Sequence, residues 1–160
     1  MEQVLITKLL DADALVFLRD NVLDVTRTRR APDVQDLYLG YDFDWPVCIV
    51  RVLDSRHESF RLSRLYADRF PVASVLTHPE AEVLTIIREK EWSRWSKVKS
   101  RKKPSVFCKD DLGMKAIKSE KFLQSYWDAE AIVAAAHEYR RLSKLAQGEL
   151  CLADLIKAGV

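Results

Sequence analysis

Glycine, proline and cysteine are scarce in this chain of 160 residues, which has four, five and three of them respectively. So little glycine and proline excludes a collagen-like or low-complexity chain. The 48% of hydrophobic and 31% of charged residues are typical of a globular, helix-rich protein and exclude a disordered one. We therefore expect one domain with a sizeable hydrophobic core.

Long hydrophobic runs and paired cysteines are absent as well. No apolar run approaches the ~20 residues that span a bilayer, and the N-terminus has no signal-peptide pattern. Cys48, Cys108 and Cys151 are widely spaced and without zinc-finger spacing, so we expect small buried side chains in a reducing compartment. The sequence thus predicts a cytoplasmic protein that makes no membrane contact.

The clearest structural signal lies between Trp45 and Ile87. A nearly continuous apolar run, Trp45–Leu53, is rich in valine and isoleucine, which favours a strand covered on both faces. Residues 59–70 have the apolar spacing of an amphipathic helix, and Val72–Leu76 is a second strand. Strand, helix and strand within about thirty residues predict a βαβ unit, and hence an α/β fold with a small, mostly parallel sheet and flanking helices.

Further elements are expected on both sides of this unit. Residues 14–17 predict a short third strand, and a helix capped by Thr77 is expected to reach Trp95. Residues 104–160 are predicted to pack on the sheet as a helical C-terminal extension of a single domain. Its expected helices are Ser105–Asp111, Ser119–Trp127, Ala129–Ala146 and Leu150–Ala158.

Acidic residues follow both strands of the βαβ unit. Asp54 ends the first strand, Glu58 comes four residues later, and Glu80 and Glu82 follow the second strand. Open α/β folds place their chemistry at this edge of the sheet, and Mg²⁺ prefers carboxylate oxygens. Asp54, Glu58 and Glu82 are therefore candidate metal ligands. The alternative for Glu80 and Glu82 is that a helix N-terminus favours acidic residues by its dipole alone.

Arginines and a histidine lie between or before these acids. Arg56 and His57 are candidates for holding a phosphate, or they pair with the neighbouring carboxylates. An earlier trio, Arg27, Arg29 and Arg30, predicts either a solvated loop or a contact with a phosphate or a partner.

A basic segment provides the best candidate surface for nucleic acid. Its lysines and arginines would attract phosphates and release counterions, and the neighbouring Trp92 or Trp95 would stack on an unpaired base. The alternative is a solvated charge run with both tryptophans in the core. The candidate residues are Arg94, Lys97, Lys99, Arg101, Lys102 and Lys103.

The stretch 49–87 resembles Toprim-like proteins, whose topoisomerase–primase fold also occurs in nucleases of phage-defence systems. The resembling motifs are the strand IVRVLD ending in Asp54, the strand VASVLT and the following HPEAEVLTII. In that family a glutamate after the first strand and an Asp-x-Asp after a later strand hold Mg²⁺. The resemblance implies a Mg²⁺-dependent, nuclease-like protein, with Asp54, Glu58 and Glu82 as ligands and a role in phage defence.

Two departures from the family pattern define a second hypothesis. The first strand with its glutamate would precede Met1, so the chain is expected to be short at its N-terminus. The second aspartate of the Asp-x-Asp is Arg56 here. The alternative function is a catalytically inactive Toprim-like module that acts through nucleic acid or a protein partner, such as an ATPase or a second copy of itself.

Overall fold

The computed structural model describes residues 1–160 and has an α/β fold built on a three-stranded parallel sheet. Strand β1 (Ile49–Leu53) pairs with β2 (Val72–Leu76) in register from Ile49↔Val72 to Leu53↔Leu76. The third strand, β3 (Leu150–Cys151), lies on the other side of β2, so the sheet order is β1-β2-β3. The predicted fold class and the parallel β1–β2 pair are confirmed.

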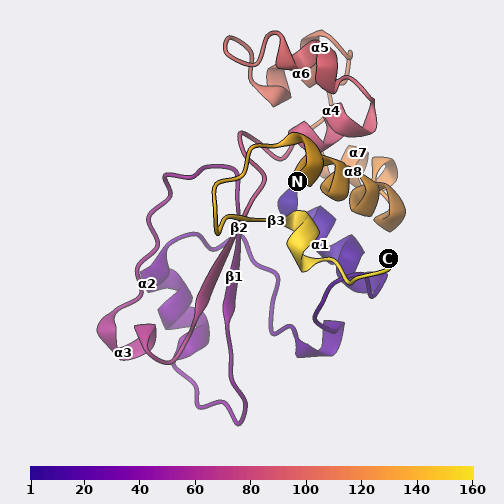
Figure 1. Ribbon diagram of the computed structural model, residues 1–160. Helices are drawn as coiled ribbons and strands as arrows, with labels where there is room; N and C mark the ends of the chain where they lie inside the picture. The colour runs from indigo at the N-terminus through magenta and orange to yellow at the C-terminus, as the bar shows by residue number, and fades with distance from the viewer.

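The sheet separates two hydrophobic clusters. Neighbouring residues of a strand point to opposite faces, and accordingly Val50 packs against a large cluster and Ile49 against a small one. The large cluster is formed mainly by α1 (Glu2–Asp11) and the C-terminal half of the chain, and the small one lies around α2 (Ala31–Val34) and α3 (Arg64–Ala67). Figure 1 shows α2 and α3 on one side of the strands and α1 and α8 on the other.

The third strand comes from a part of the chain that was predicted to be helical. Instead of a helix over residues 150–158, the chain forms β3, a 3₁₀ helix (Leu152–Leu155) and an isolated antiparallel bridge from Ile156 to Leu15. The predicted strand at residues 14–17 was wrong, because only that single bridge forms there and Val16 is 58% exposed. Pairing with Leu76 of β2 therefore outweighs the local helical pattern.

The helix predicted between β1 and β2 is also shorter than expected. Residues 59–63 are not helical, because Phe60 and Leu62 pack into the small cluster and Ser63 N donates to Gln35 Oε1 at 2.6 Å. Only the single turn α3 remains. Residues Gln35–Leu39 continue α2 as a π-helix that ends before Gly40.

The chain after β2 is mostly helical, as predicted. Thr77 does not cap a helix: its hydroxyl donates to the carbonyl of Leu53 at 3.2 Å, and the next helix begins at Val83. A left-handed residue, Lys90 (φ 62°), then splits the predicted long helix in two. The helices of this part are α4 (Val83–Arg88), α5 (Trp92–Ser96), α6 (Pro104–Asp110), α7 (Glu120–Tyr126) and α8 (Ala129–Leu142).

The longest helix, α8, illustrates why these segments are helical. Asp128 caps its N-terminus by accepting from Ala131 N at 2.7 Å. Its buried residues share one helical face, which packs on α4 and α1. They are Ile132, Val133, Ala135, Ala136 and Tyr139.

The cysteines differ in their surroundings. Cys108 and Cys151 are buried as expected, and burial raises the pKa of the Cys108 thiol to about 12. Cys48 is exposed, because β1 begins only at Ile49, so the prediction of burial was wrong for this residue. None of the helices combines the length and hydrophobicity needed to cross a membrane.

Candidate functional site

The structure does not assemble Asp54, Glu58 and Glu82 into a metal site. Glu58 pairs with Arg51 at 3.1 Å, whereas Glu82 is 5% exposed and pairs with Lys118 at 3.4 Å. Asp54 follows β1 and is half-buried. No group of three or more His, Cys, Asp or Glu side chains is placed to hold a metal ion. These residues therefore do not fit the predicted Mg²⁺ site.

Two carboxylates of this region have structural roles instead. The Glu58–Arg51 pair lies beside Phe60, whose ring centroid is 4.4 Å from the Arg51 guanidinium carbon, and so joins β1 to the chain that follows it. Glu80 does not lie at the N-terminus of the helix that follows it, because α4 begins at Val83. Instead, its carboxylate accepts a hydrogen bond from Ser105 N, in the first turn of α6, at 2.9 Å. That contact satisfies one of the free N–H groups at the start of α6.

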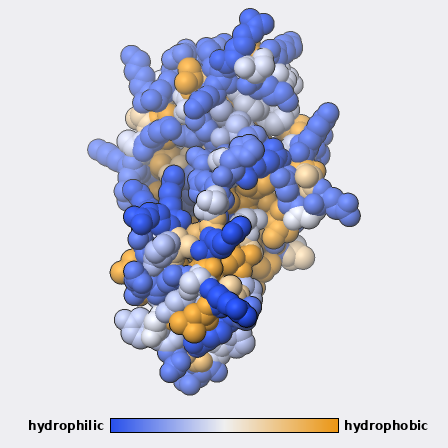
Figure 2. All heavy atoms as spheres, turned by 90° about the vertical axis from the view of Figure 1, so that its left-hand side faces the viewer, coloured by the Kyte–Doolittle hydropathy of each residue, from blue (hydrophilic) through white to orange (hydrophobic).

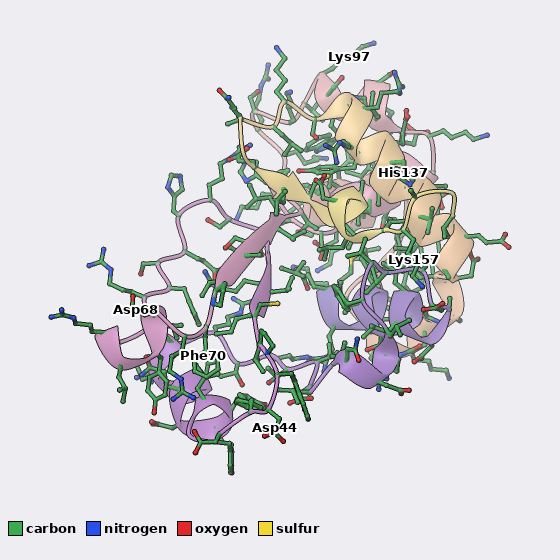
Figure 3. The ribbon with its side chains drawn as sticks, turned by 60° about the horizontal axis from the view of Figure 1, so that its bottom comes forward. Asp44, Asp68, Phe70, Lys97, His137 and Lys157 are labelled. Carbon is green, nitrogen blue, oxygen red and sulfur yellow. The ribbon has the colours of Figure 1, made fainter.

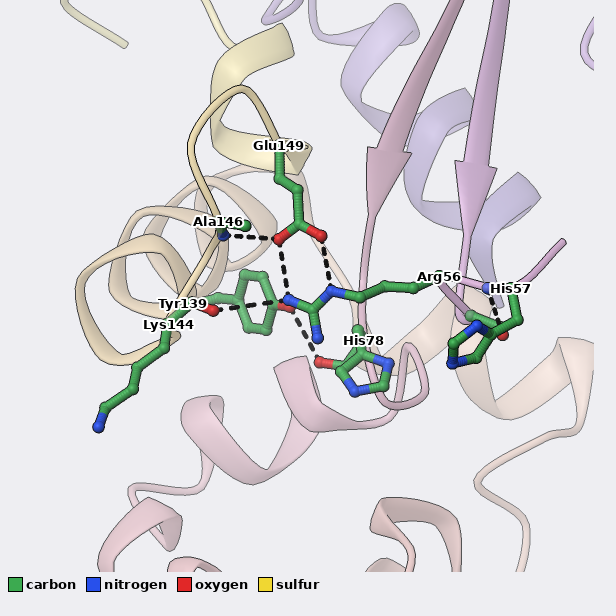
Figure 4. Close-up of polar contacts among 8 residues, drawn as sticks. Arg56, His57, His78, Tyr139, Lys144, Ala146 and Glu149 are labelled. Atoms are coloured by element: carbon green, nitrogen blue, oxygen red, sulfur yellow. Dashed lines mark hydrogen bonds and ion pairs between the residues drawn. The ribbon is translucent and has the colours of Figure 1, made fainter.

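Arg56, predicted to hold a phosphate, pairs with a carboxylate 93 residues away (Figure 4). Its Nε and Nη2 donate to the two oxygens of Glu149 at 2.6 and 2.9 Å. This bidentate pair, together with the N–H of Ala146, lowers the pKa of the Glu149 carboxyl to about 2. The pair connects the segment after β1 to the turn before β3, so Arg56 is a structural residue here.

The two histidines near this pair differ in their contacts. His57 is exposed, and its only hydrogen bond is from its backbone N–H to Ser55 Oγ at 3.2 Å. His78 follows β2, its carbonyl accepts from the Tyr139 hydroxyl at 2.9 Å, and its Nδ1 is buried without a partner. The structure therefore places His57 with neither a carboxylate nor a second histidine.

The Arg56–Glu149 pair predicts a pH-dependent contribution to stability. Because the folded-state pKa of Glu149 lies below its ordinary value of 4.5, the contribution is present above pH 4.5 and is lost as the pH falls toward 2. Arg56→Gln should therefore lower the free energy of unfolding at pH 7, and the difference from wild type should close below pH 4.5. Urea denaturation at several pH values measures it, with Arg61→Gln, which has no ion pair, as the control. A difference that does not change with pH would contradict this assignment.

The predicted basic segment belongs to a larger cationic surface. Residues 90–118 contain ten lysines and arginines but three acids, a surplus of seven in a chain whose net charge is +2. We call this surface the basic end. It lies at the end of the molecule formed by α5 and α6, where hydrophilic side chains dominate the top of Figure 2, and Figure 3 shows Lys97 at this end and Phe70 at the other.

Two of the predicted residues hold the basic end together. Arg94 pairs with Asp111 at 3.5 Å, and Lys102 pairs with the same carboxylate at 2.6 Å. The Trp95 ring is buried and its Nε1 donates to the Lys102 carbonyl at 3.4 Å. Trp95 is therefore a core residue and does not stack on a base, whereas Trp92 is half-buried and packs against Trp95 with 5.2 Å between ring centroids.

Of the eight remaining cations of the basic end, Lys118 pairs with Glu82, and the other seven are exposed and form no ion pair. Four of them, Lys97, Lys99, Arg101 and Lys103, were predicted from the charge run. The other three were missed because they lie outside that run, although a charge count over a window of thirty residues would have found them. They are Lys90, Lys109 and Lys115. The structure thus presents seven cations with no internal acidic partner on a surface that is stabilised by contacts of Trp95 and Asp111 with Lys102.

Comparisons of the chain with protein-family models, with curated proteins and with solved structures found no match.

Proposed function

We propose that this protein is a nucleic-acid-binding module that contacts the phosphate backbone through its basic end. The observation that carries the proposal is the set of seven exposed cations without acidic partners. Exposed lysine and arginine that are free of ion pairs are available to neutralise phosphates and to release their counterions. Their grouping on a surface held by buried contacts presents them together to one strand or duplex.

A binding module has more support than the Mg²⁺-dependent nuclease that the resemblance to Toprim-like proteins implied. Metal-assisted phosphodiester cleavage needs carboxylates that are free to bind the ion. Glu58 and Glu82 each have a cationic partner, and no suitable group of ligands is assembled. The proposal takes this module to be a catalytically inactive Toprim-like protein, and that resemblance rests on the motifs IVRVLD, VASVLT and HPEAEVLTII of residues 49–87.

A salt titration tests this function. We expect the protein to bind a fluorescent 20-base-pair DNA duplex in an anisotropy assay at 50 mM salt. The logarithm of the association constant should fall linearly with the logarithm of the salt concentration, with a slope of about −0.9 for each phosphate contact. If all seven available cations contact phosphates, the slope reaches its steepest expected value of roughly −6. Absence of binding at 50 mM salt, or binding that does not depend on salt, would overturn the proposal.

A further inference from the structure

Strand β1 lies at one edge of the sheet, because β2 is its only neighbour. In a parallel pair of strands, every second residue directs both its N–H and its C=O group toward the neighbouring strand. Ile49 N donates to the Pro71 carbonyl at 2.9 Å, so Ile49 and the other odd-numbered residues of β1 face β2. The backbone groups of Val50 and Val52 therefore point outward along the open edge.

Nothing in the chain occupies these outward groups. No hydrogen bond joins the backbone of Val50 or Val52 to a residue outside β2, and both residues are only half-buried. Natural edge strands avoid pairing with other chains through proline, bulges or charged side chains. β1 has no proline and pairs with β2 without a bulge, and the side chain of its one charged residue, Arg51, is 10% exposed and paired with Glu58. The edge is thus open to a further strand.

We propose that a second copy of this chain pairs with β1 through its own β1, in antiparallel orientation about a two-fold axis, and extends the sheet across both copies. Contacts about a two-fold axis are the commonest in soluble homo-oligomers. The two antiparallel strands would exchange N–H···O=C bonds at Val50 and Val52, which satisfies groups that the single chain leaves to water. This interaction is separate from the nucleic-acid binding proposed for the basic end.

The surroundings of β1 favour a second copy over an isolated peptide. Val50 packs against the large hydrophobic cluster and Ile49 against the small one, so side chains cover both faces of the strand. A peptide added at the edge would leave its own two faces without such cover. A second copy brings cover for both, because a two-fold axis perpendicular to the sheet places the large clusters of the two copies on the same side.

The side chains of β1 select one register for this pairing. Residues directly opposite each other project on the same face, and like charges in that position are destabilising. A two-fold axis at Arg51 would place the two arginines opposite each other, and an axis at Val52 would place Asp54 opposite Val50. An axis at Val50 avoids both pairs, because it places the two Val50 residues opposite each other and Cys48 opposite Val52.

Sedimentation velocity of the full chain at concentrations up to about 200 µM measures the self-association. We expect a monomer–dimer equilibrium for wild type and dimerisation weaker by about tenfold or more in Val52→Pro, because proline removes an outward donor but no β1–β2 hydrogen bond. The matched control is Val72→Pro, at an exposed position of β2 whose backbone faces away from β1 and which β3 does not reach. It should dimerise as wild type does. Circular dichroism establishes that each variant is folded.

A disulfide tests the register without the proline variant. Cys48 is exposed, and the thiol introduced by Val52→Cys would lie opposite Cys48 of the second copy, at a Cα separation of about 5.5 Å that a disulfide can bridge. Mild oxidation should therefore link two copies covalently, which non-reducing gel electrophoresis detects. Wild type and Val72→Cys, whose added thiol lies away from the β1 edge, should give little covalent dimer under the same conditions.

The same measurements can reject the interface. A chain that remains monomeric at about 200 µM would contradict it. A dimer that Val52→Pro and Val72→Pro weaken equally, with no disulfide between positions 48 and 52, would be formed by another surface and would also contradict it. If Val52→Pro does not fold, the presence or absence of that disulfide decides. Failure of the basic end to bind DNA would leave the sedimentation result unchanged, so the two proposals fail independently.

Discussion

Replacement of Lys97, Lys99, Arg101 and Lys103 by glutamine is expected to weaken duplex binding by roughly a thousandfold at 0.1 M salt. These four residues are exposed and have no acidic partner, so each is free to neutralise a phosphate. Removing four such contacts should also make the salt slope less negative by roughly three to four. Anisotropy titrations of wild type and variant over a range of salt concentrations measure both quantities.

A control variant separates local contacts from net charge. Arg61, Arg64, Lys121 and Lys144 are exposed, form no ion pair and lie outside the basic end. Their replacement by glutamine changes the net charge by the same amount, and we expect less than a fivefold effect on affinity, because charges beyond a Debye length of ~10 Å are largely screened. Equal losses in the two variants would mean that binding follows total charge and that the basic end is not the interface.

The Trp95→Ala variant is expected to lose about 3–5 kcal/mol of stability. Trp95 is 3% exposed, packs against Trp92 and donates to the Lys102 carbonyl, so its removal leaves a cavity and an unsatisfied contact beneath the basic end. Urea denaturation followed by circular dichroism gives the change in the free energy of unfolding.

Another tryptophan provides the matched control. Trp45 is 60% exposed, and Trp45→Ala should change the free energy of unfolding by no more than about 0.5 kcal/mol. A loss below about 1 kcal/mol in Trp95→Ala would contradict the assignment of this ring to the core, since large-to-small changes at buried aromatic positions cost several times that amount.

The sequence allowed prediction of those elements whose signals are local. β1 and β2 are five-residue runs of mainly apolar residues, and α7 (Glu120–Tyr126) lies within the predicted helix Ser119–Trp127. β3 has two residues, and its conformation depends on β2, which lies more than seventy residues earlier. A strand so short has no periodicity of its own to detect. The break between α4 and α5 likewise arises from the left-handed backbone conformation of Lys90, which the presence of a lysine in the sequence does not predict.

In the candidate site too, the features that depend on local sequence could be predicted, whereas those that depend on contacts between distant residues could not. The cationic run at residues 94–103 was visible because charge is a property of the residues themselves. Which of its members are neutralised depends on Asp111, which lies beyond the run but folds back beside Arg94 and Lys102. The partner of Arg56 was even harder to predict from the sequence, because Glu149 is 93 residues away and no pattern in the chain connects the two residues. Acidic residues after parallel strands indicated a metal site, but Glu58 forms a salt bridge with Arg51, and Glu82 forms one with Lys118.

The basic end also gives the molecule a strong electrostatic polarity that its net charge of +2 conceals. With ten of the 26 cationic residues but only three of the 24 acids in residues 90–118, the rest of the chain carries five more acids than cations. Such a separation of charge orients a protein as it approaches a polyanion and raises the rate of productive encounters at low ionic strength. A phosphate backbone would therefore meet α5 and α6 first, with the acidic remainder of the molecule turned away from it.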